Sequence, residues 1–72
     1  MTETVRAPLS KSARQARITE LIERGPVGSQ AELAARLGES GIAVSQGTLS
    51  KDLLELGAVR VRTASGQFAY AL

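Results

Sequence analysis

A short polar segment beyond the middle of the chain carries residue types that suit contact with nucleic acid. The amide, the two hydroxyls and the cation of this segment belong to Gln46, Thr48, Ser50 and Lys51. Such groups can bond base edges in a major groove or phosphate oxygens. Gly47 costs a helix about 1 kcal/mol relative to alanine, which is reasonable where a partner must approach the backbone closely. The alternative is that Gly47 merely eases the first turn and that the hydroxyls only favour a cap.

Three helices are expected to position this segment. The first is predicted over 12–24, because Ser12 and Gln15 have the spacing of a capping box and Pro26 forbids continuation. The second is predicted from Ser29 to about residue 37, and the third over 45–56 with Ser45 as its N-cap. Apolar residues recur along each at spacings of three and four, which gives each helix one core-facing side.

The sequence after Gly57 changes to the period of a strand. Apolar and polar residues alternate over 59–63, a turn signal follows at 64–66, and a second strand is predicted over 67–72. An isolated hairpin is only marginally stable in water, so this one is expected to pack against the helices. Phe68 and Tyr70 are expected to cover the core, and stacking on an exposed base is the minor alternative.

Composition excludes several classes of function. The chain has 72 residues and contains no cysteine and no histidine. Disulfides, thiolate or imidazole metal sites and cysteine or serine–histidine catalysis are therefore ruled out, and we expect neither an enzyme nor a metal site. The acidic side chains are expected on solvated helix faces. No apolar stretch approaches the ~18 residues that span a bilayer, and the net charge of +2 is compatible with nucleic-acid binding without proving it.

The order of the elements is that of a winged helix-turn-helix, an α+β class that is mainly α. Residues 1–10 are expected to form a flexible arm and 11–72 the domain. In this arrangement the third helix enters the groove, while cations of the wing hold phosphates. Arg60 and Arg62 lie on the polar face of the first strand, although charges there can also protect a sheet edge.

Four further residues are expected to anchor the DNA backbone, and three of them have an alternative explanation. Arg17 lies on the outer flank of the first helix, whereas the stem of Arg14 could pack on the apolar side. Ser29 and Gln30 begin the second helix, where backbone N–H groups can receive a phosphate, but plain capping explains them at least as well. The predicted DNA contacts are thus Ser45, Gln46, Thr48, Ser50, Lys51, Arg60, Arg62, Arg14, Arg17, Ser29 and Gln30.

The segment 45–62, SQGTLSKDLLELGAVRVR, resembles the arginine repressor family. That family typically carries Thr-Gln-Ala-Thr-(Leu/Val)-Ser-Arg-Asp here, followed by a Glu-Leu step and a basic strand. The stretches at 14–18, 29–33, 41–44 and 66–70 are also similar to family segments. Three positions depart from the pattern, namely Ser45, Gly47 and Lys51. The last replaces an arginine and loses its bidentate geometry.

The resemblance implies a winged-helix domain of a bacterial, cytoplasmic transcription regulator that binds double-stranded operator DNA and controls genes of arginine metabolism. It implies arginine as co-repressor of the full-length protein, with no cofactor in this chain. It also implies trimers and hexamers, formed through a C-terminal domain that we expect to be absent here. The competing hypothesis is a winged-helix module that binds proteins and not DNA, for which exposed Leu54 is the only apolar docking candidate.

Overall fold

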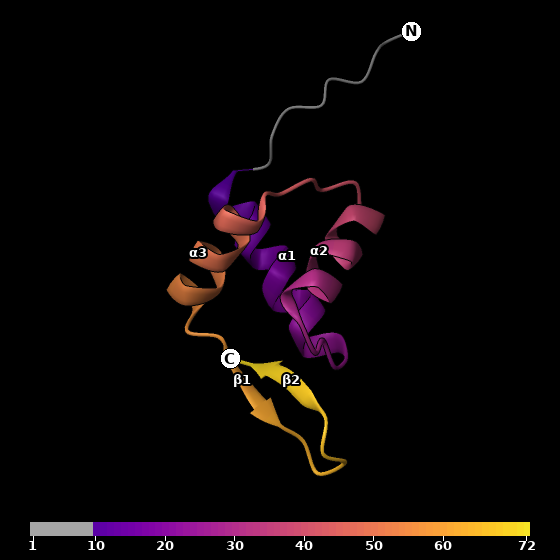
Figure 1. Ribbon diagram of the computed structural model, residues 1–72. Coiled ribbons are helices and arrows are strands. Elements are labelled where there is room, and N and C mark those ends of the chain that lie inside the picture. The colour runs from indigo at the N-terminus through magenta and orange to yellow at the C-terminus, as the bar shows by residue number, and fades with distance from the viewer. Residues whose placement is uncertain (1–9) are drawn as a thin grey trace, which may run out of the picture.

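Three helices and then a two-stranded hairpin follow one another in the computed structural model, which describes residues 10–72 (Figure 1). The bounds are α1 Lys11–Arg24, α2 Gln30–Glu39, α3 Gln46–Leu56, β1 Val59–Arg62 and β2 Phe68–Ala71. This order confirms the predicted winged helix-turn-helix class. The arm expected over residues 1–10 lies outside the described residues, apart from Ser10. None of the helices within 10–72 is long and apolar enough to cross a membrane.

Serine hydroxyls begin all three helices, and the prediction was right for two of them. Ser29 accepts from the backbone N–H of Glu32, and Ser45 accepts from that of Thr48. The prediction for α1 was wrong, because Ser10 is its N-cap and Ser12 lies inside the first turn. The expected partner of Ser12, Gln15, directs its amide to α3 and not back to the helix start.

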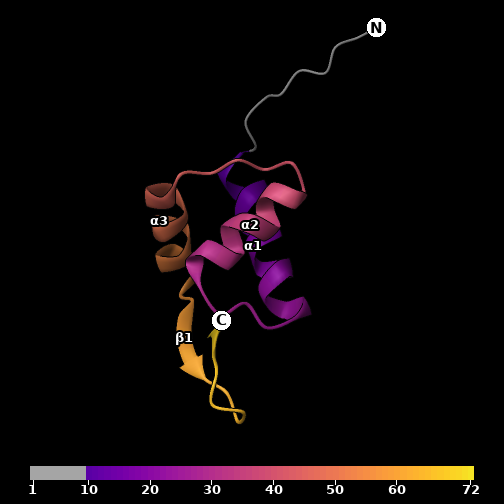
Figure 2. The same ribbon diagram turned by 45° about the vertical axis from the view of Figure 1, so that its right-hand side comes forward.

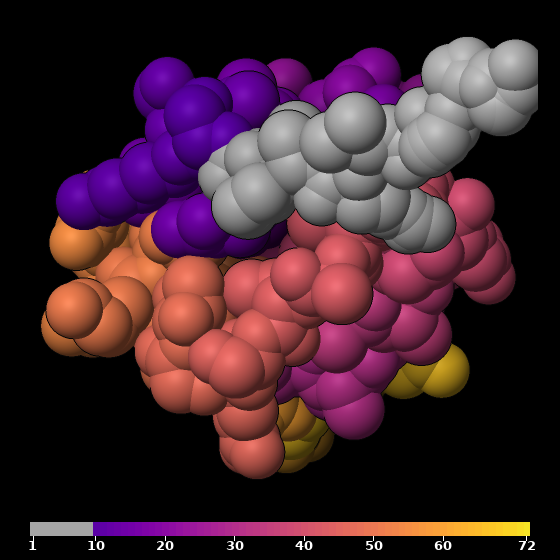
Figure 3. All heavy atoms as spheres, turned by 90° about the horizontal axis from the view of Figure 1, so that it is seen from above, coloured from indigo at the N-terminus to yellow at the C-terminus, as the bar shows by residue number. Residues whose placement is uncertain are grey.

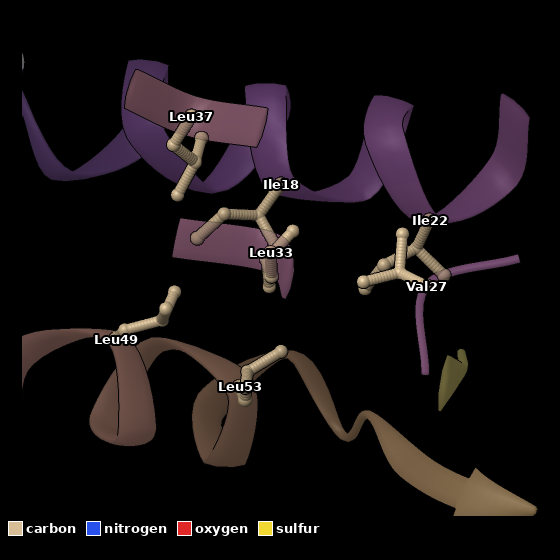
Figure 4. Packing of buried hydrophobic residues seen from close by; sticks show 7 residues of the cluster. All are labelled: Ile18, Ile22, Val27, Leu33, Leu37, Leu49 and Leu53. Carbon is tan, nitrogen blue, oxygen red and sulfur yellow. The ribbon is translucent and has the colours of Figure 1, made fainter. Parts of the chain in front are cut away.

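The core lies where the three helices meet (Figure 4). Ile18 of α1 and Leu33 of α2 are fully buried at its centre, and Leu49 of α3 is 1 % exposed. The complete cluster consists of Ile18, Ile22, Val27, Leu33, Leu37, Leu49 and Leu53. Burying such a side chain contributes about 1.5–3 kcal/mol, so the burial of this cluster helps to fix α3 on the body of the domain.

The hairpin meets this body near its open end and projects away from it (Figures 1 and 2). The backbone N–H of Tyr70 donates to the carbonyl of Val27 at 2.9 Å, and Tyr70 packs on the core cluster as expected. Ala69 is buried, whereas Phe68 is 44 % exposed. The prediction that Phe68 covers the core is therefore wrong. The physical reason is that the Phe68 ring lies against the guanidinium groups of Arg60 and Arg62 and not against the core cluster.

Gly28 allows the hairpin to approach the segment between α1 and α2. A Cβ at this position would lie 2.9 Å from the carbonyl oxygen of Phe68, a backbone atom that cannot rotate away. We therefore expect Gly28→Ala to lower the free energy of unfolding by at least about 1 kcal/mol, as overpacking does. Urea denaturation followed by circular dichroism measures the change.

Gly25→Ala is the matched control, because nothing lies within 4 Å of a Cβ there and its φ of −177° is extended backbone. We expect this variant to retain full stability or to gain a few tenths of a kcal/mol from the stiffer unfolded chain. Equal stability of the two alanine variants would contradict the close approach.

Candidate nucleic-acid interface

The outer face of α3 is polar and open to solvent. Gln46, Ser50 and Lys51 are exposed, and Thr48 is half-buried on the flank. Figure 3 shows the chain that leads into α3 (salmon) at the surface between the start of α1 (indigo) and α2 (magenta). Gly47 is exposed as well, and an added Cβ would meet nothing within 4 Å. Packing within the domain therefore gives no reason for a glycine at this position.

Ser45 organises the N-terminus of α3 with both functions of its hydroxyl. Its Oγ accepts from the backbone N–H of Thr48 at 3.2 Å and donates to Oγ1 of the same residue at 2.9 Å. The first bond satisfies one of the orphan donors of the helix terminus. The second holds the Thr48 side chain in one orientation beside the cap.

Gln30 connects the start of α2 to the exposed face of α3. Its Nε2 donates to the backbone carbonyl of Gln46 at 3.1 Å, and its Oε1 accepts from Oγ of Ser50 at 3.1 Å. Both ends of the amide are therefore used within the domain. Ser29, beside it, is the cap of α2. Ser29 and Gln30, both predicted to anchor the DNA backbone, thus have defined positions within the helix-turn-helix.

An ion pair between α1 and α3 lies beneath the exposed face. The Arg14 guanidinium donates to both carboxylate oxygens of Asp52, through Nε to Oδ2 and through an Nη to Oδ1 at 2.9 Å. The Asp52 side chain is 3 % exposed and that of Arg14 17 %. The hydrogen bonds from Arg14 hold the pKa of Asp52 below its usual value. Gln15 Nε2 adds a third bond to Oδ1 at 3.0 Å.

A second contact between α1 and α3 lies at the surface nearby. Lys11 Nζ is 2.7 Å from Oε1 of Glu55, and Gln15 Nε2 donates to the same oxygen at 3.0 Å. The hydrogen bond from Lys11 lowers the pKa of Glu55, and that from Gln15 adds to it. These partners compensate both carboxylates of α3, Asp52 and Glu55.

The hairpin presents two arginines on an aromatic ring. The register pairs Arg62 with Phe68 and Arg60 with Tyr70, which places these four residues on one face. The guanidinium carbons of Arg60 and Arg62 lie 4.7 Å and 4.9 Å from the centroid of the Phe68 ring. A ring face attracts a cation without neutralising its charge. Phe68 therefore holds both guanidinium groups in place while they remain charged and exposed.

The cations of the domain fall into two groups. Lys11, Arg14, Arg17, Arg24 and Arg36 each pair with a carboxylate. Within residues 10–72, Lys51, Arg60 and Arg62 form no such ion pair. The unpaired positive charge of the described domain is therefore confined to α3 and the hairpin.

Comparison with known proteins supplies the family. Residues 9–72 match the family described as "Arginine repressor, DNA binding domain". The chain belongs to this arginine repressor family. The arginine repressor of Chlorobaculum tepidum is 45 % identical over 64 residues, which cover 89 % of this chain and 43 % of that protein. The arginine repressor of Acetivibrio thermocellus is 43 % identical over 61 residues, which cover 85 % and 40 %. The chain thus spans about two fifths of the length of these curated relatives.

Family membership confirms the resemblance inferred from residues 45–62, and the structure adds where the predicted site residues lie. Gln46, Thr48, Ser50 and Lys51 come together on α3, next to its N-cap Ser45. Arg60 and Arg62 lie on the hairpin. Arg17 lies apart from them, because its guanidinium bonds Glu20 Oε1 at 2.7 Å and Ser40 Oγ at 2.8 Å.

Sequence reasoning missed one residue of this arginine repressor domain, Asp52. The acids were all expected on solvated faces, and for Asp52 that expectation is wrong because its carboxylate is 3 % exposed. A signal was present: Asp52 lies three positions after Leu49, within the apolar stripe of α3. An acid in one apolar stripe and an arginine near another together indicate a buried pair.

Proposed function

We propose that this domain binds double-stranded DNA in a sequence-specific manner. In the proposed complex α3 lies in the major groove and the hairpin contacts the phosphate backbone. The observation that carries the proposal is that, among the described residues 10–72, the cations without a carboxylate partner are Lys51, Arg60 and Arg62. They lie on the same elements as the polar groups that can bond base edges.

The proposed roles follow from position and exposure. Gln46, Ser50 and Lys51 face the groove, with Thr48 at its side, while Ser45 caps α3. Arg60 and Arg62 bind phosphates. For Arg14 the bidentate bond to Asp52 supports a role in positioning α3 more than a direct DNA contact. Arg17 and Ser29 are already bonded within the domain, and direct contact by either stays a prediction.

For the full-length protein we propose a bacterial transcription regulator of arginine metabolism, which acts in the cytoplasm with arginine as co-repressor. The names and the greater length of the two relatives support this proposal. Trimers and hexamers would form through a further domain. Linked copies would raise the effective concentration at adjacent DNA sites, so an isolated domain should bind weakly.

The alternative is a protein-docking module, which Leu54 favours because it is 80 % exposed on α3. Two steps discriminate between these functions. First, the chain enriches duplexes from a randomised pool. Second, the enriched duplex and a scrambled duplex are titrated at two salt concentrations. We expect tighter binding of the enriched duplex and weaker binding of both at the higher salt. Failure to enrich any sequence would refute the proposed function and leave the docking module.

Arg62→Ala tests the phosphate contacts of the hairpin. We expect this variant to bind the enriched and scrambled duplexes more weakly by the same factor, and to flatten the salt dependence of log K by roughly one. Fluorescence anisotropy over a range of salt concentrations measures the slope. Arg36→Ala is the control, because Arg36 is paired with Glu32 on α2 and should leave the slope unchanged. A loss confined to one duplex sequence would contradict the phosphate role.

A further inference from the structure

The hydrogen bonds of Gln30 form a chain with one direction. The backbone carbonyl of Gln46 can only accept, so the group of Gln30 that faces it at 3.1 Å must be the amide nitrogen. The opposite orientation would bring two acceptor oxygens together. The Oε1 of Gln30 must then face Ser50, and Oε1 can only accept. The hydroxyl hydrogen of Ser50 is consequently directed at Gln30, across 3.1 Å.

This direction changes what Ser50 can offer a base. A serine hydroxyl has one hydrogen to donate and two lone pairs that accept. With its hydrogen committed to Gln30, Oγ retains only acceptor capacity. Ser50 is exposed on the groove-facing side of α3, so its lone pairs are open to a partner. An acceptor there matches the exocyclic amino groups that adenine N6 and cytosine N4 present in the major groove, whereas guanine and thymine present only acceptors.

We propose that Gln30 is a positioning residue that makes Ser50 an obligate acceptor, so that Ser50 selects adenine or cytosine over guanine or thymine at one position of the bound strand. The inference rests on the proposed function and deepens it. It also changes the role expected of Gln30, which acts through Ser50 and not as a phosphate contact of its own.

Three variants test whether Gln30 sets the donor–acceptor direction of the Ser50 hydroxyl or only connects α2 to α3. Gln30→Leu removes both hydrogen bonds and frees the Ser50 hydroxyl to donate. Gln30→Glu loses the bond to the Gln46 carbonyl but still offers Ser50 an acceptor. Ser50→Ala removes the hydroxyl itself. If Gln30 only fastened α2 to α3, the glutamate variant, which loses one of the two bonds, would lose part of the base preference. If Gln30 sets the direction of the Ser50 hydroxyl, glutamate retains the full base preference and leucine does not.

The experiment begins with the duplex that wild type enriches from a random pool. Single base-pair replacements identify the position at which Ser50→Ala loses discrimination. At that position we expect wild type and Gln30→Glu to prefer adenine or cytosine over guanine or thymine by about five-fold, the strength of one hydrogen bond. We expect Ser50→Ala and Gln30→Leu to discriminate less than two-fold there. Replacing an adenine there by purine, which lacks the amino group, should weaken wild type and not Ser50→Ala.

Several results would overturn the inference while leaving DNA binding intact. These are a preference for guanine or thymine at the Ser50 position, an unchanged preference in Gln30→Leu, equal losses in the leucine and glutamate variants, or no position affected by Ser50→Ala. Circular dichroism establishes that each variant is folded. If wild type enriches no sequence, the proposed function fails and this inference fails with it.

Discussion

Replacing Asp52 by alanine is expected to lower the free energy of unfolding by about 3–5 kcal/mol. The substitution leaves the Arg14 guanidinium, 17 % exposed, without the carboxylate that takes two of its hydrogen bonds. Small domains are stable by only about 5–15 kcal/mol, so the variant would lose a large fraction of the stability of the domain. Urea denaturation monitored by circular dichroism measures the loss.

Two control variants test the cause. Arg24→Ala removes an exposed guanidinium 3.7 Å from Glu20 and should cost less than about 0.5 kcal/mol. The double variant Arg14→Leu with Asp52→Leu replaces the buried charges by apolar groups and should recover most of the loss. A loss below about 1 kcal/mol in Asp52→Ala would show that the pair does not hold α3.

Acid titration checks the same pair independently. The Arg14 hydrogen bonds hold the pKa of Asp52 below the usual 3.8. A lowered pKa in the folded state means that the carboxylate stabilises the fold above its unfolded pKa and ceases to do so as the pH falls through the folded value. Wild type should therefore lose stability as the pH falls below about 4, and Asp52→Asn should show a flatter dependence in that range.

Lys51→Ala is expected to weaken binding of the enriched duplex by about 1–3 kcal/mol. Lys51 is exposed next to Ser50 on α3, and no carboxylate within the described residues 10–72 pairs with it, so its charge is available to a base or phosphate. Anisotropy titration at one fixed salt concentration measures the effect. Arg36→Ala, which removes a paired cation from α2, is the matched control. Unchanged affinity in a variant that circular dichroism shows to be folded would remove Lys51 from the interface.

The local features of the fold could be predicted because they depend on residues within a turn of one another. The caps at Ser29 and Ser45 and the stripe of Leu49 and Leu53 are of this kind, and the structure confirms them. The prediction of the α1 cap was wrong although a cap is a local feature. Two serines, Ser10 and Ser12, compete there, and Gln15 bonds α3 in a contact that no local pattern specifies.

The features that escaped prediction depend on how distant elements pack. Arg14 and Asp52 are 38 residues apart, and Gln30 and Ser50 are 20 apart. The residue types permit these side-chain pairs, but the pairs form only because the packed helices bring the side chains together. The prediction that Phe68 covers the core was wrong for the same reason. Alternation correctly placed it on one face of β2 with Tyr70, yet only the packing of the hairpin decides that Tyr70 meets the core cluster and Phe68 the two arginines.

The contacts between α1 and α3 also determine whether α3 could be transplanted. Taken alone, α3 carries one cation, Lys51, and two carboxylates, Asp52 and Glu55, for a net charge of −1. Phosphate would repel such a peptide. Arg14 and Lys11 reverse the sign to +1 by pairing with the two carboxylates. A graft of α3 onto a foreign scaffold would therefore have to bring these two cations of α1 with it.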